Sequence, residues 1–576
     1  MRRSPVALLV LCTALIGCLF AAPTASARQD VVFGIEQFGN MENPRYTDEF
    51  QSIMVRDGAR IMRYTVRWDW VARECNPATR GNAADMNNPC YAWGYLDEIV
   101  RKADRKGLKV LFSIYGTPGW LFGGRDNYTG TTDAEFNAFV AHYAAFSEAV
   151  ATRFDGRHGL PRVEQLTIWN EPNGSFFQPR VVGGQLVGPA RYAKVYDTAA
   201  RRIKAVDSTL RVAPGPTAPH SASLPPYTFA QGVLPLLNQW GSPIDGWAHN
   251  AYTGRQSPLR NTIKKPYIGL GNVGDLTALM DQYGVSKGKP IWITEFGYQT
   301  SGGQKAIEVE EQPPLVADAL YFAWLQPRIE TFIWYQLHDD AYTSPYDFMS
   351  GLYYEKDKQC DGTLCAKPGA AMYRHTIWTS TRNRLGRVTL WGQGRMQPSA
   401  TRLFVKKPGQ EWQAFANPTT AQNGTVYITL ALPVGTIATI CDIACGPQVT
   451  VSQTVAGGGG SATKVKKLKA VTLGKRSSLA RGIVFNVNCS GCKVAAVITA
   501  RGRLSGIRAA AKRTVKVGSA RVTNVRGTQA KRVHLRFTKA AKRELARKRT
   551  AVVTIRTTIV YADGTRDTSD RPVRLR

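Results

Sequence analysis

Between residues 30 and 385 the chain alternates short apolar runs with longer amphipathic segments, and this alternation limits the possible folds more than any other feature. Repeated units of a strand and a helix are typical of a parallel sheet covered by helices. Eight apolar runs qualify as strands, near residues 31–34, 60–64, 110–114, 165–169, 210–213, 246–249, 291–294 and 331–335. Eight units in roughly 350 residues predict an α/β fold, a (β/α)8 TIM barrel. The alternative is an open, doubly wound sheet, but no glycine-rich phosphate loop follows the first strand.

Changes in composition divide the rest of the chain. Alternating apolar and polar residues with turn-forming residues between them predict two small all-β sandwich domains after the barrel. The stretch Gly457–Gly460 followed by Ser461 has the composition of a flexible linker. The predicted parts are a barrel over 28–387, an accessory β-sandwich over 388–456, a linker over 457–463 and a basic β domain over 464–576, which resembles immunoglobulin-like β modules.

The N-terminus has the three parts of a secretory signal peptide. Arg2 and Arg3 precede an apolar run over 6–22, and small residues at 25–27 form a cleavage site. We therefore expect residues 1–27 to be removed and the mature protein to be secreted or associated with the cell wall. A lipoprotein anchored through Cys18 is the alternative. No other apolar run is long enough for a transmembrane segment.

Eight cysteines remain outside the predicted signal peptide. They form close neighbours in the sequence: Cys75 and Cys90, Cys360 and Cys365, Cys441 and Cys445, and Cys489 and Cys492. An even number of closely spaced cysteines in an exported chain predicts local disulfide bonds. Zinc binding at Cys489 and Cys492 is the alternative, but no second cysteine pair or histidine cluster accompanies them.

The net charge of +33 is concentrated in the last domain. From Ser461 onward there are 30 Lys and Arg residues against 4 Asp and Glu residues, whereas the rest of the chain has a net charge of only +7. A domain this basic favours polyanions, and for an exported protein we expect an anionic cell-wall polymer as the partner. Nucleic acid is not expected, because the domain has few aromatic residues for base stacking. A charged surface that only keeps the protein soluble is the alternative.

Two glutamates stand where predicted barrel strands end. Glu171 follows the fourth apolar run, and Glu295 closes the seventh. Catalytic groups of TIM barrels lie at the carboxyl ends of the strands, and an unpaired carboxylate is costly to bury there. Each glutamate alone could simply be ion-paired at a strand end, but two on strands four and seven favour catalysis.

The residues around these glutamates resemble the motifs of clan A glycoside hydrolases, most closely those of families 39 and 5. Trp169-Asn170-Glu171-Pro172-Asn173 is similar to the acid/base motif, and Thr294-Glu295-Phe296-Gly297 is similar to the nucleophile motif. Further matches are Arg63, Thr117-Pro118-Gly119-Trp120, His249-Asn250-Ala251-Tyr252 and Trp334. The resemblance covers residues 30 to about 385 and implies a retaining TIM-barrel enzyme without a cofactor or a metal ion.

The resemblance also implies roles for these residues. Glu295 is the expected nucleophile and Glu171 the expected acid/base, with a raised pKa. Arg63 and Tyr252 are expected to hold the ionised nucleophile, and Asn170 to bind the sugar 2-hydroxyl. Further expected substrate contacts are His249, as a positioning residue, and the indoles of Trp120 and Trp334, as stacking platforms.

Other interpretations of the same residues stay open at this point. A carbohydrate-binding protein on a barrel without turnover would conflict with the intact Glu171 and Glu295. A transglycosidase would carry the same residues as a hydrolase. Glu36 and the segment 338–340 are equally compatible with lining outer subsites and with pairing to loop cations. The expected substrate is an oligosaccharide or a polysaccharide.

Overall fold

The computed structural model divides the chain into two compact units, residues 1–461 and 462–576. It describes residues 30–576 except for 38, 125–126, 220–223, 302–305, 342–346, 361–362, 384–385, 416–422, 453–468, 474–482, 489–491, 502–513, 526–530, 538–550, 561–565 and 576, and from residue 469 onward it describes strands without side chains. The predicted signal peptide and the predicted linker over 457–463 therefore lie outside the described residues. None of the described helices is long and apolar enough to cross a membrane.

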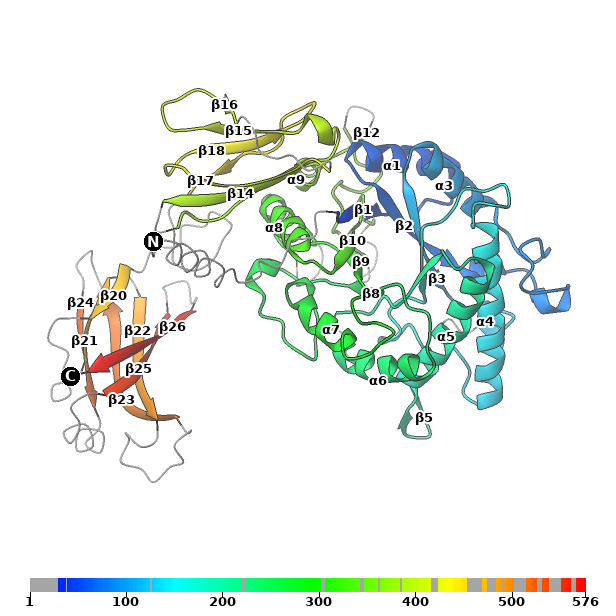
Figure 1. Ribbon diagram of the computed structural model, residues 1–576, viewed down its shortest axis with the longest axis horizontal. Coiled ribbons are helices and arrows are strands. Elements are labelled where there is room, and N and C mark those ends of the chain that lie inside the picture. The colour runs from blue at the N-terminus through cyan, green and yellow to red at the C-terminus, as the bar shows by residue number, and fades with distance from the viewer. Residues whose placement is uncertain are drawn as a thin grey trace, which may run out of the picture. The chain divides into compact units, whose positions relative to one another are not determined.

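Eight parallel strands form the centre of the first unit, and helices surround them as a ring (Figure 1). The strands are β1 (Val32–Glu36), β2 (Ile61–Arg67), β3 (Lys109–Tyr115), β4 (Gln165–Ile168), β7 (Arg211–Pro214), β8 (Trp247–Asn250), β9 (Ile291–Phe296) and β10 (Ile329–Tyr335). They are hydrogen-bonded in the order β7-β4-β3-β2-β1-β10-β9-β8. A parallel bridge between Thr217 and His249 links the two ends of this order. The predicted TIM barrel is confirmed, and each of the eight predicted strands is present.

Each strand is followed by at least one helix. The helices are α1 (Pro44–Arg56), the short α2 (Trp68–Val71), α3 (Gly94–Arg105), α4 (Asp133–Arg153), α5 (Gly188–Val206), α6 (Pro226–Gln239), α7 (Val273–Met280), α8 (Gln312–Leu325) and α9 (Pro368–Arg374). Sequence-local contacts explain several helix ends: Thr132 and Glu135 form a reciprocal capping box at the start of α4.

Side chains along each barrel strand alternate between the barrel interior and the surrounding helices, so the barrel has two separate hydrophobic cores. The barrel interior holds a small cluster of inward-facing side chains: Ile61, Leu111, Ala213, Ala248, Trp292 and Ile333. The residues between them, such as Met62 and Phe332, face outward and belong to the large core between strands and helices. The side chain at a given strand position therefore faces either the interior or the helices, and this decides which residues reach the mouth of the barrel.

A sandwich of two antiparallel sheets follows α9. One sheet has the order β13 (His375–Thr379), β14 (Arg387–Gly394), β17 (Thr425–Ala431). The other consists of β16 (Gln413–Ala414), β15 (Arg402–Lys406), β18 (Ile437–Cys441) and β19 (Val449–Thr450). Because β13 pairs with β14, the sandwich begins before the predicted boundary at residue 388. β13 follows α9 directly, so no linker composition marks the boundary.

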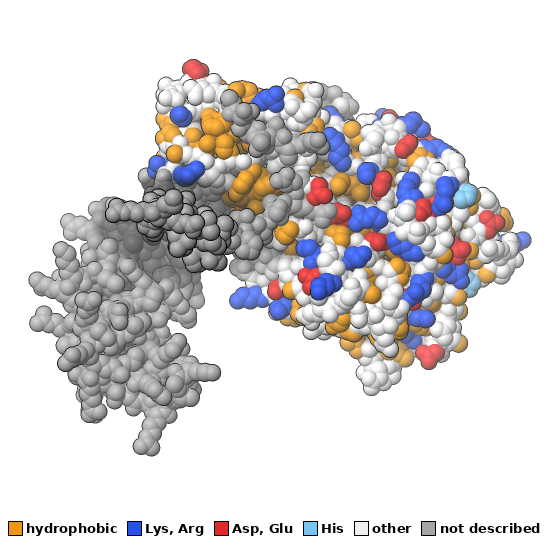
Figure 2. Space-filling model, in the orientation of Figure 1, with side chains coloured by type: hydrophobic (Ala, Val, Ile, Leu, Met, Phe, Trp, Pro, Cys, Tyr) orange, Lys and Arg blue, Asp and Glu red, His pale blue; other side chains and the backbone are white. Residues whose placement is uncertain are grey.

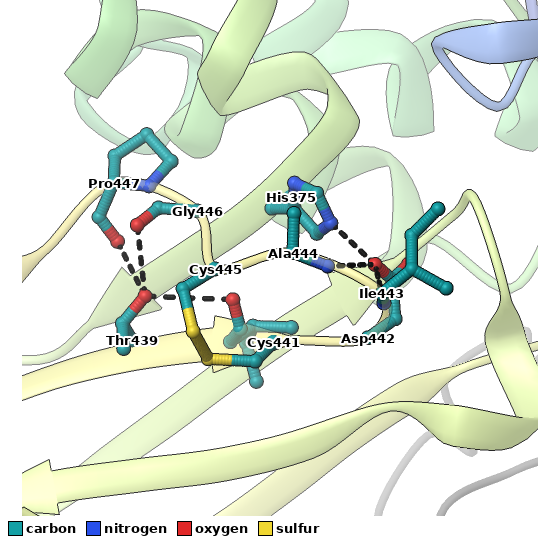
Figure 3. Close-up of a disulfide and its surroundings, with 10 residues drawn as sticks. His375, Thr439, Cys441, Asp442, Ile443, Ala444, Cys445, Gly446 and Pro447 are labelled. Atoms are coloured by element: carbon teal, nitrogen blue, oxygen red, sulfur yellow. Dashed lines mark hydrogen bonds and ion pairs between the residues drawn. A yellow bond between two sulfur atoms is a disulfide. The ribbon is translucent and has the colours of Figure 1, made fainter.

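Disulfide bonds brace the loops of this first unit. Cys75–Cys90, Cys360–Cys365 and Cys441–Cys445 are paired, as the sequence predicted. Figure 3 shows Cys441–Cys445 closing the loop after β18, where Asp442 also pairs with His375 at 2.6 Å. The bond predicted between Cys489 and Cys492 lies outside the residues with described side chains.

The described residues of the second unit form seven strands in one hydrogen-bonded order, β20-β21-β24-β23-β22-β25-β26. Their bounds are Lys469–Leu473, Ile483–Asn488, Cys492–Arg501, Thr514–Val525, Lys531–Phe537, Ala551–Val560 and Arg566–Leu575 for β20 to β26. The pairings are antiparallel, which confirms the predicted all-β character of this domain.

Aromatic side chains fasten the sandwich to the barrel. Tyr321 on α8 stacks on Trp378 of β13 with ring centroids 3.8 Å apart. Trp391 of β14 is fully buried and contacts both Tyr321 and Trp324 of the same helix. This packing makes the sandwich a structural part of the first unit.

We expect Trp391→Ala to lower the free energy of unfolding by about 3–5 kcal/mol, the usual cost of truncating a buried tryptophan. Chemical denaturation followed by circular dichroism measures this change. Trp412→Ala is the matched control, because Trp412 lies in the same sandwich with 37% of its surface exposed. The control should change stability by no more than about 0.5 kcal/mol. Equal effects of the two substitutions would contradict the packing role of Trp391.

Candidate active site

A β-bulge turns Glu295 into the barrel. Along β9, Trp292 faces the interior and Ile293 faces the helices, so strict alternation would point Glu295 outward. The pairing with both neighbouring strands shifts by one residue between Ile293 and Phe296. The extra residue lets Thr294 and Glu295 both face inward, which is the usual effect of a bulge beside an active site.

A second irregularity of the backbone, directly after β4, turns Asn170 and Glu171 into the barrel. Trp169 and Glu171 have positive φ values of 73° and 48°, which are uncommon for residues other than glycine. This turn sends the fully buried indole of Trp169 into the outer core, where it contacts Phe139 and Tyr143. The next two side chains then point into the barrel mouth, and backbone strain of this kind is often concentrated at functional sites.

The guanidinium of Arg63 connects the strands around the mouth. Its Nη1 donates to Glu36 Oε2 at 2.5 Å and to Glu295 Oε1 at 2.7 Å. Its Nη2 donates to Asn170 Oδ1 at 3.0 Å, and its Nε donates to Ser113 Oγ at 2.9 Å. Arg63 is only 1% exposed, so these four acceptors replace the water that a charged group would otherwise bind.

Glu295 receives a second donor on its other oxygen. The Tyr252 hydroxyl donates to Oε2 at 3.0 Å. Burial raises the pKa of Tyr252 well above its usual value, so the hydroxyl keeps its proton and remains a donor. Both oxygens of Glu295 are therefore stabilised as a carboxylate.

Glu171 is in a different environment, although it faces the same space. Burial raises its pKa to about 7, and the negative charge of Glu295 acts in the same direction. Its Oε1 accepts one hydrogen bond, from Asn250 Nδ2 at 2.8 Å. Asn250 in turn accepts a bond from Thr294 at 2.9 Å, so one amide links the two glutamate-bearing segments. One carboxyl is thus suited to carry a proton, and the other to carry a charge.

Comparison with known protein families gives one match. Residues 59–230 match the model of glycosyl hydrolases family 39, a stretch that runs from the start of β2 into α6. This part of the barrel is therefore similar to family 39 glycosyl hydrolases, and the match supports a glycosidase. No curated protein matches the chain.

Several solved structures resemble the glycosidase. A family 39 glycoside hydrolase from Bacteroides cellulosilyticus WH2 has 13% sequence identity and a TM-score of 0.46, with 74% of this chain and 79% of that chain covered. A glucosidase from Croceicoccus marinus has 12% identity and a TM-score of 0.43, with coverages of 84% and 88%. A β-glucosidase from Pyrococcus furiosus has 13% identity and a TM-score of 0.43, with coverages of 60% and 94%.

Five of the predicted site residues of the glycosidase lie together around the mouth. They are Arg63, Asn170, Glu171, Tyr252 and Glu295. Asn170 offers its carbonyl to Arg63, which leaves its amide nitrogen directed elsewhere in the site. Arg63 and Tyr252 both contact Glu295, the residue for which the resemblance implies the role of nucleophile.

Two predicted substrate contacts lie outside the mouth of the glycosidase. His249 is fully buried, and its nitrogens contact Thr217 Oγ1 at 2.8 Å and the Ile268 carbonyl at 2.9 Å. Trp334 is also fully buried, and its Nε1 donates to the Ser350 carbonyl. The alternation of β8 and β10 turns both side chains toward the outer core. The structure therefore corrects the expectation that His249 and Trp334 touch the substrate.

Trp120 is only partly exposed and lies between barrel elements. Its Nε1 donates to the Ala72 carbonyl at 2.7 Å, and its ring meets Trp68 and His142 edge-on. These contacts give Trp120 a packing role between the loop after α2 and helix α4.

Sequence reasoning missed the inward-facing neighbours of these residues. Asn250, rather than His249, reaches Glu171, and Tyr335, rather than Trp334, faces the same side of the barrel as Glu295. The Tyr335 ring is 5.2 Å from Phe348 and 6.5 Å from Tyr252, so these three rings form an aromatic wall. The signal that could have found them is the two-residue period, because Ala248 and Ile333 face the interior.

Glu36 is a third carboxyl of the site, and it is buried. Burial raises its pKa to about 8, while the charge of Arg63 lowers it and that of Glu295 raises it. Its contact with Arg63 answers the question that the sequence left open: Glu36 pairs with a cation of the mouth. A neutral Glu36 leaves the charge of Arg63 available to Glu295.

We expect Asn250→Ala to move the alkaline limb of the pH profile of kcat/KM to higher pH. Wild-type activity should fall as the pH rises through about 7, because Glu171 then loses the proton that it must donate. The bond from Asn250 favours the ionised form of Glu171, so its loss should raise the limb by about one pH unit.

Initial rates between pH 4 and 10 measure this limb. Asn238→Ala is the matched control, since Asn238 is exposed at the C-terminal end of α6 and should leave the limb in place. An unmoved limb, or one that moves to lower pH in Asn250→Ala, would contradict the assignment to Glu171.

Proposed function

We propose that this glycosidase is an exported enzyme that hydrolyses an oligosaccharide or a polysaccharide by double displacement, with retention of configuration. Glu295 is the nucleophile and Glu171 the acid/base. The observation that supports this division most directly is the unequal environment of the two carboxyls. Glu295 is held by Arg63 and Tyr252, whereas burial raises the pKa of Glu171 to about 7.

In the first step, an oxygen of Glu295 attacks the anomeric carbon and the bond to the leaving oxygen breaks. Glu171 gives its proton to that oxygen, so the leaving group departs as an alcohol and Glu171 becomes a carboxylate. Arg63 and Tyr252 hold the attacking carboxylate in position, and positioning of this kind lowers the entropic barrier of the reaction. The product of this step is a covalent glycosyl-enzyme.

In the second step, Glu171 removes a proton from a water molecule, and the water oxygen attacks the anomeric carbon. The bond to Glu295 breaks, Glu295 regains its charge, and Glu171 is protonated again. One water is consumed per bond cleaved, and the enzyme returns to its starting state. The role proposed for Asn170 is a hydrogen bond to the sugar 2-hydroxyl, because its orientation is fixed by Arg63 at the mouth.

We expect Glu295→Gln to lower kcat by at least about 10⁴-fold, and Glu171→Ala to lower it strongly on substrates with poor leaving groups. The measurement is hydrolysis of a panel of polysaccharides and aryl glycosides. Azide should partly restore Glu171→Ala on activated aryl glycosides, because this anion attacks the glycosyl-enzyme in place of water and needs no general base. The bond to Glu295 then breaks and a glycosyl azide is released. Glu295→Gln should not respond in that way.

Equal turnover of wild type and Glu295→Gln on every substrate would refute the proposal. If neither protein hydrolyses any substrate, the result would favour a carbohydrate-binding protein that keeps the barrel without turnover. Sugar transfer to an added acceptor, with no release of reducing sugar, would instead identify a transglycosidase.

The proposed location is outside the cell, with the basic domain bound to an anionic wall polymer. On the face of the first unit that Figure 2 shows, cationic and anionic side chains are interspersed, whereas the last domain has a large excess of Lys and Arg in its sequence. Long-range attraction to a polyanion therefore belongs to the last domain.

We expect the full chain to bind an isolated teichoic acid and a chain ending at residue 456 to lose this binding. Binding should weaken as salt rises, since the attraction is electrostatic. Co-sedimentation measures it, with a neutral polysaccharide as the control polymer. Unchanged binding after truncation would refute the role of the basic domain.

The predicted cleavage after Ala27 is tested separately, by determining the N-terminal residue of the exported protein.

A further inference from the structure

An aromatic surface lies at the rim of the barrel, beside the loop that carries Glu171. It consists of Arg67, Trp70, Tyr115 and Phe176, and we call it the rim shelf. Trp70 is 36% exposed and Phe176 is 38% exposed, although both are large apolar side chains. They follow β2 and β4, which are the two neighbours of β3 in the barrel sheet.

The members of the rim shelf are continuous. The guanidinium carbon of Arg67 lies 5.0 Å from the centre of the Trp70 ring and 5.6 Å from that of Tyr115. The Tyr115 ring is 6.3 Å from the Phe176 ring. Indole, guanidinium, phenol and phenyl groups thus follow one another across three adjacent strand ends. Trp70 and Phe176 are the exposed ends of this series, whereas Tyr115 between them is only 9% exposed and Arg67 is half-buried. Exposed apolar side chains that are linked in this way can form one binding surface.

The charged member of the shelf is fixed in place. Arg67 Nε donates to Asp69 Oδ1 at 2.7 Å, and Nη2 donates to the other oxygen of the same carboxylate. Gly116 at the end of β3 makes room for this pair: a Cβ atom there would lie 2.2 Å from Asp69 Oδ1, and its φ of +99° also favours glycine. The pair neutralises its own charge, so the shelf offers flat apolar faces and fixed polar groups rather than a net charge.

The position of the shelf relates it to the acid/base. The Tyr115 ring contacts the Trp169 ring at 5.1 Å, and Trp169 Nε1 donates to the Phe176 carbonyl. Trp169 stands two residues before Glu171 in the chain. The other side of the mouth consists of β8, β9, β10 and the loops that follow them, which carry Glu295, Tyr252 and the aromatic wall with Tyr335. These strands are separated from β2, β3 and β4 in the strand order.

We propose that the rim shelf is the subsite for the leaving group, and that it binds a neutral sugar ring next to the bond that is cleaved. The proposal rests on the double-displacement function proposed above. Glu171 protonates the leaving oxygen, so the sugar attached to that oxygen must lie on the Glu171 side of the mouth. Sugar rings have apolar C–H faces that pack on exposed indole and phenyl rings, while their hydroxyls can bond to the Arg67–Asp69 pair.

Two substrates with the same reacting sugar test the proposal. One is the glycosyl fluoride, whose leaving group is too small to reach the shelf. The other is the trisaccharide of that sugar. In the full-length protein, Trp70→Ala and Phe176→Ala should each lower kcat/KM for the trisaccharide about tenfold and change it less than twofold for the fluoride. Trp412→Ala is the control, because it removes an equally exposed tryptophan from the sandwich and should leave both substrates unaffected.

Other outcomes overturn the proposal. If the two shelf variants keep wild-type kcat/KM on the trisaccharide, the shelf binds no leaving group. If they lose activity equally on both substrates, Trp70 and Phe176 support the fold of the site instead. Failure of the proposed function is distinguishable from both results, because wild type and Glu295→Gln would then behave alike even on the fluoride.

Discussion

The bonds of one buried guanidinium organise the mouth of this barrel. Arg63 stands on β2 and donates to side chains on β1, β3 and β9 and in the turn after β4. A charged group that is 1% exposed is tolerated only when its donors are satisfied, so its acceptors cannot move independently of it. Removal of any one acceptor would leave a buried charge less well balanced and would disturb the remaining three contacts.

The same guanidinium explains how three carboxyls share one site. Glu36, Glu171 and Glu295 face a single buried cation, and the pKa values of Glu36 and Glu171 are raised to about 8 and about 7, chiefly by burial. The raised pKa values favour the protonated forms of Glu36 and Glu171. Arg63 is then free to balance the charge that a nucleophile needs. In the proposed mechanism, the division of labour between acid and nucleophile therefore depends on the three carboxyls together.

Two local departures from regular strand geometry make this arrangement possible. The bulge in β9 and the positive φ values at Trp169 and Glu171 each place two consecutive side chains on the inner face. In a regular strand only one of each pair would face inward. Thr294 with Glu295 and Asn170 with Glu171 are thus brought close enough for Asn250 to join the two segments.

The sequence predicted which residues stand at the ends of the barrel strands. It did not predict which of the side chains there face into the barrel. The eight apolar runs, the two glutamates, Arg63 and Tyr252 were predictable because barrel chemistry concentrates where strands end. His249 and Trp334 were each assigned in place of an inward-facing neighbour, Asn250 and Tyr335. A shift of one residue along a strand moves the assigned side chain to the opposite face of the sheet. Motif similarity alone does not show which face a side chain occupies. The partner of Glu36 was also beyond reach, since it depends on which strands become neighbours when the barrel closes.

The most direct test of the account is the chemical identity of the trapped intermediate. A 2-deoxy-2-fluoro glycosyl fluoride slows both steps, so the glycosyl-enzyme accumulates long enough for mass spectrometry of the intact protein and of its proteolytic peptides. The account predicts an increase in mass by one fluorosugar per chain, located on Glu295 in the peptide that contains β9, and absent from Glu295→Gln. A label on Glu171 or Glu36, or steady turnover in Glu295→Gln with no label, would contradict it.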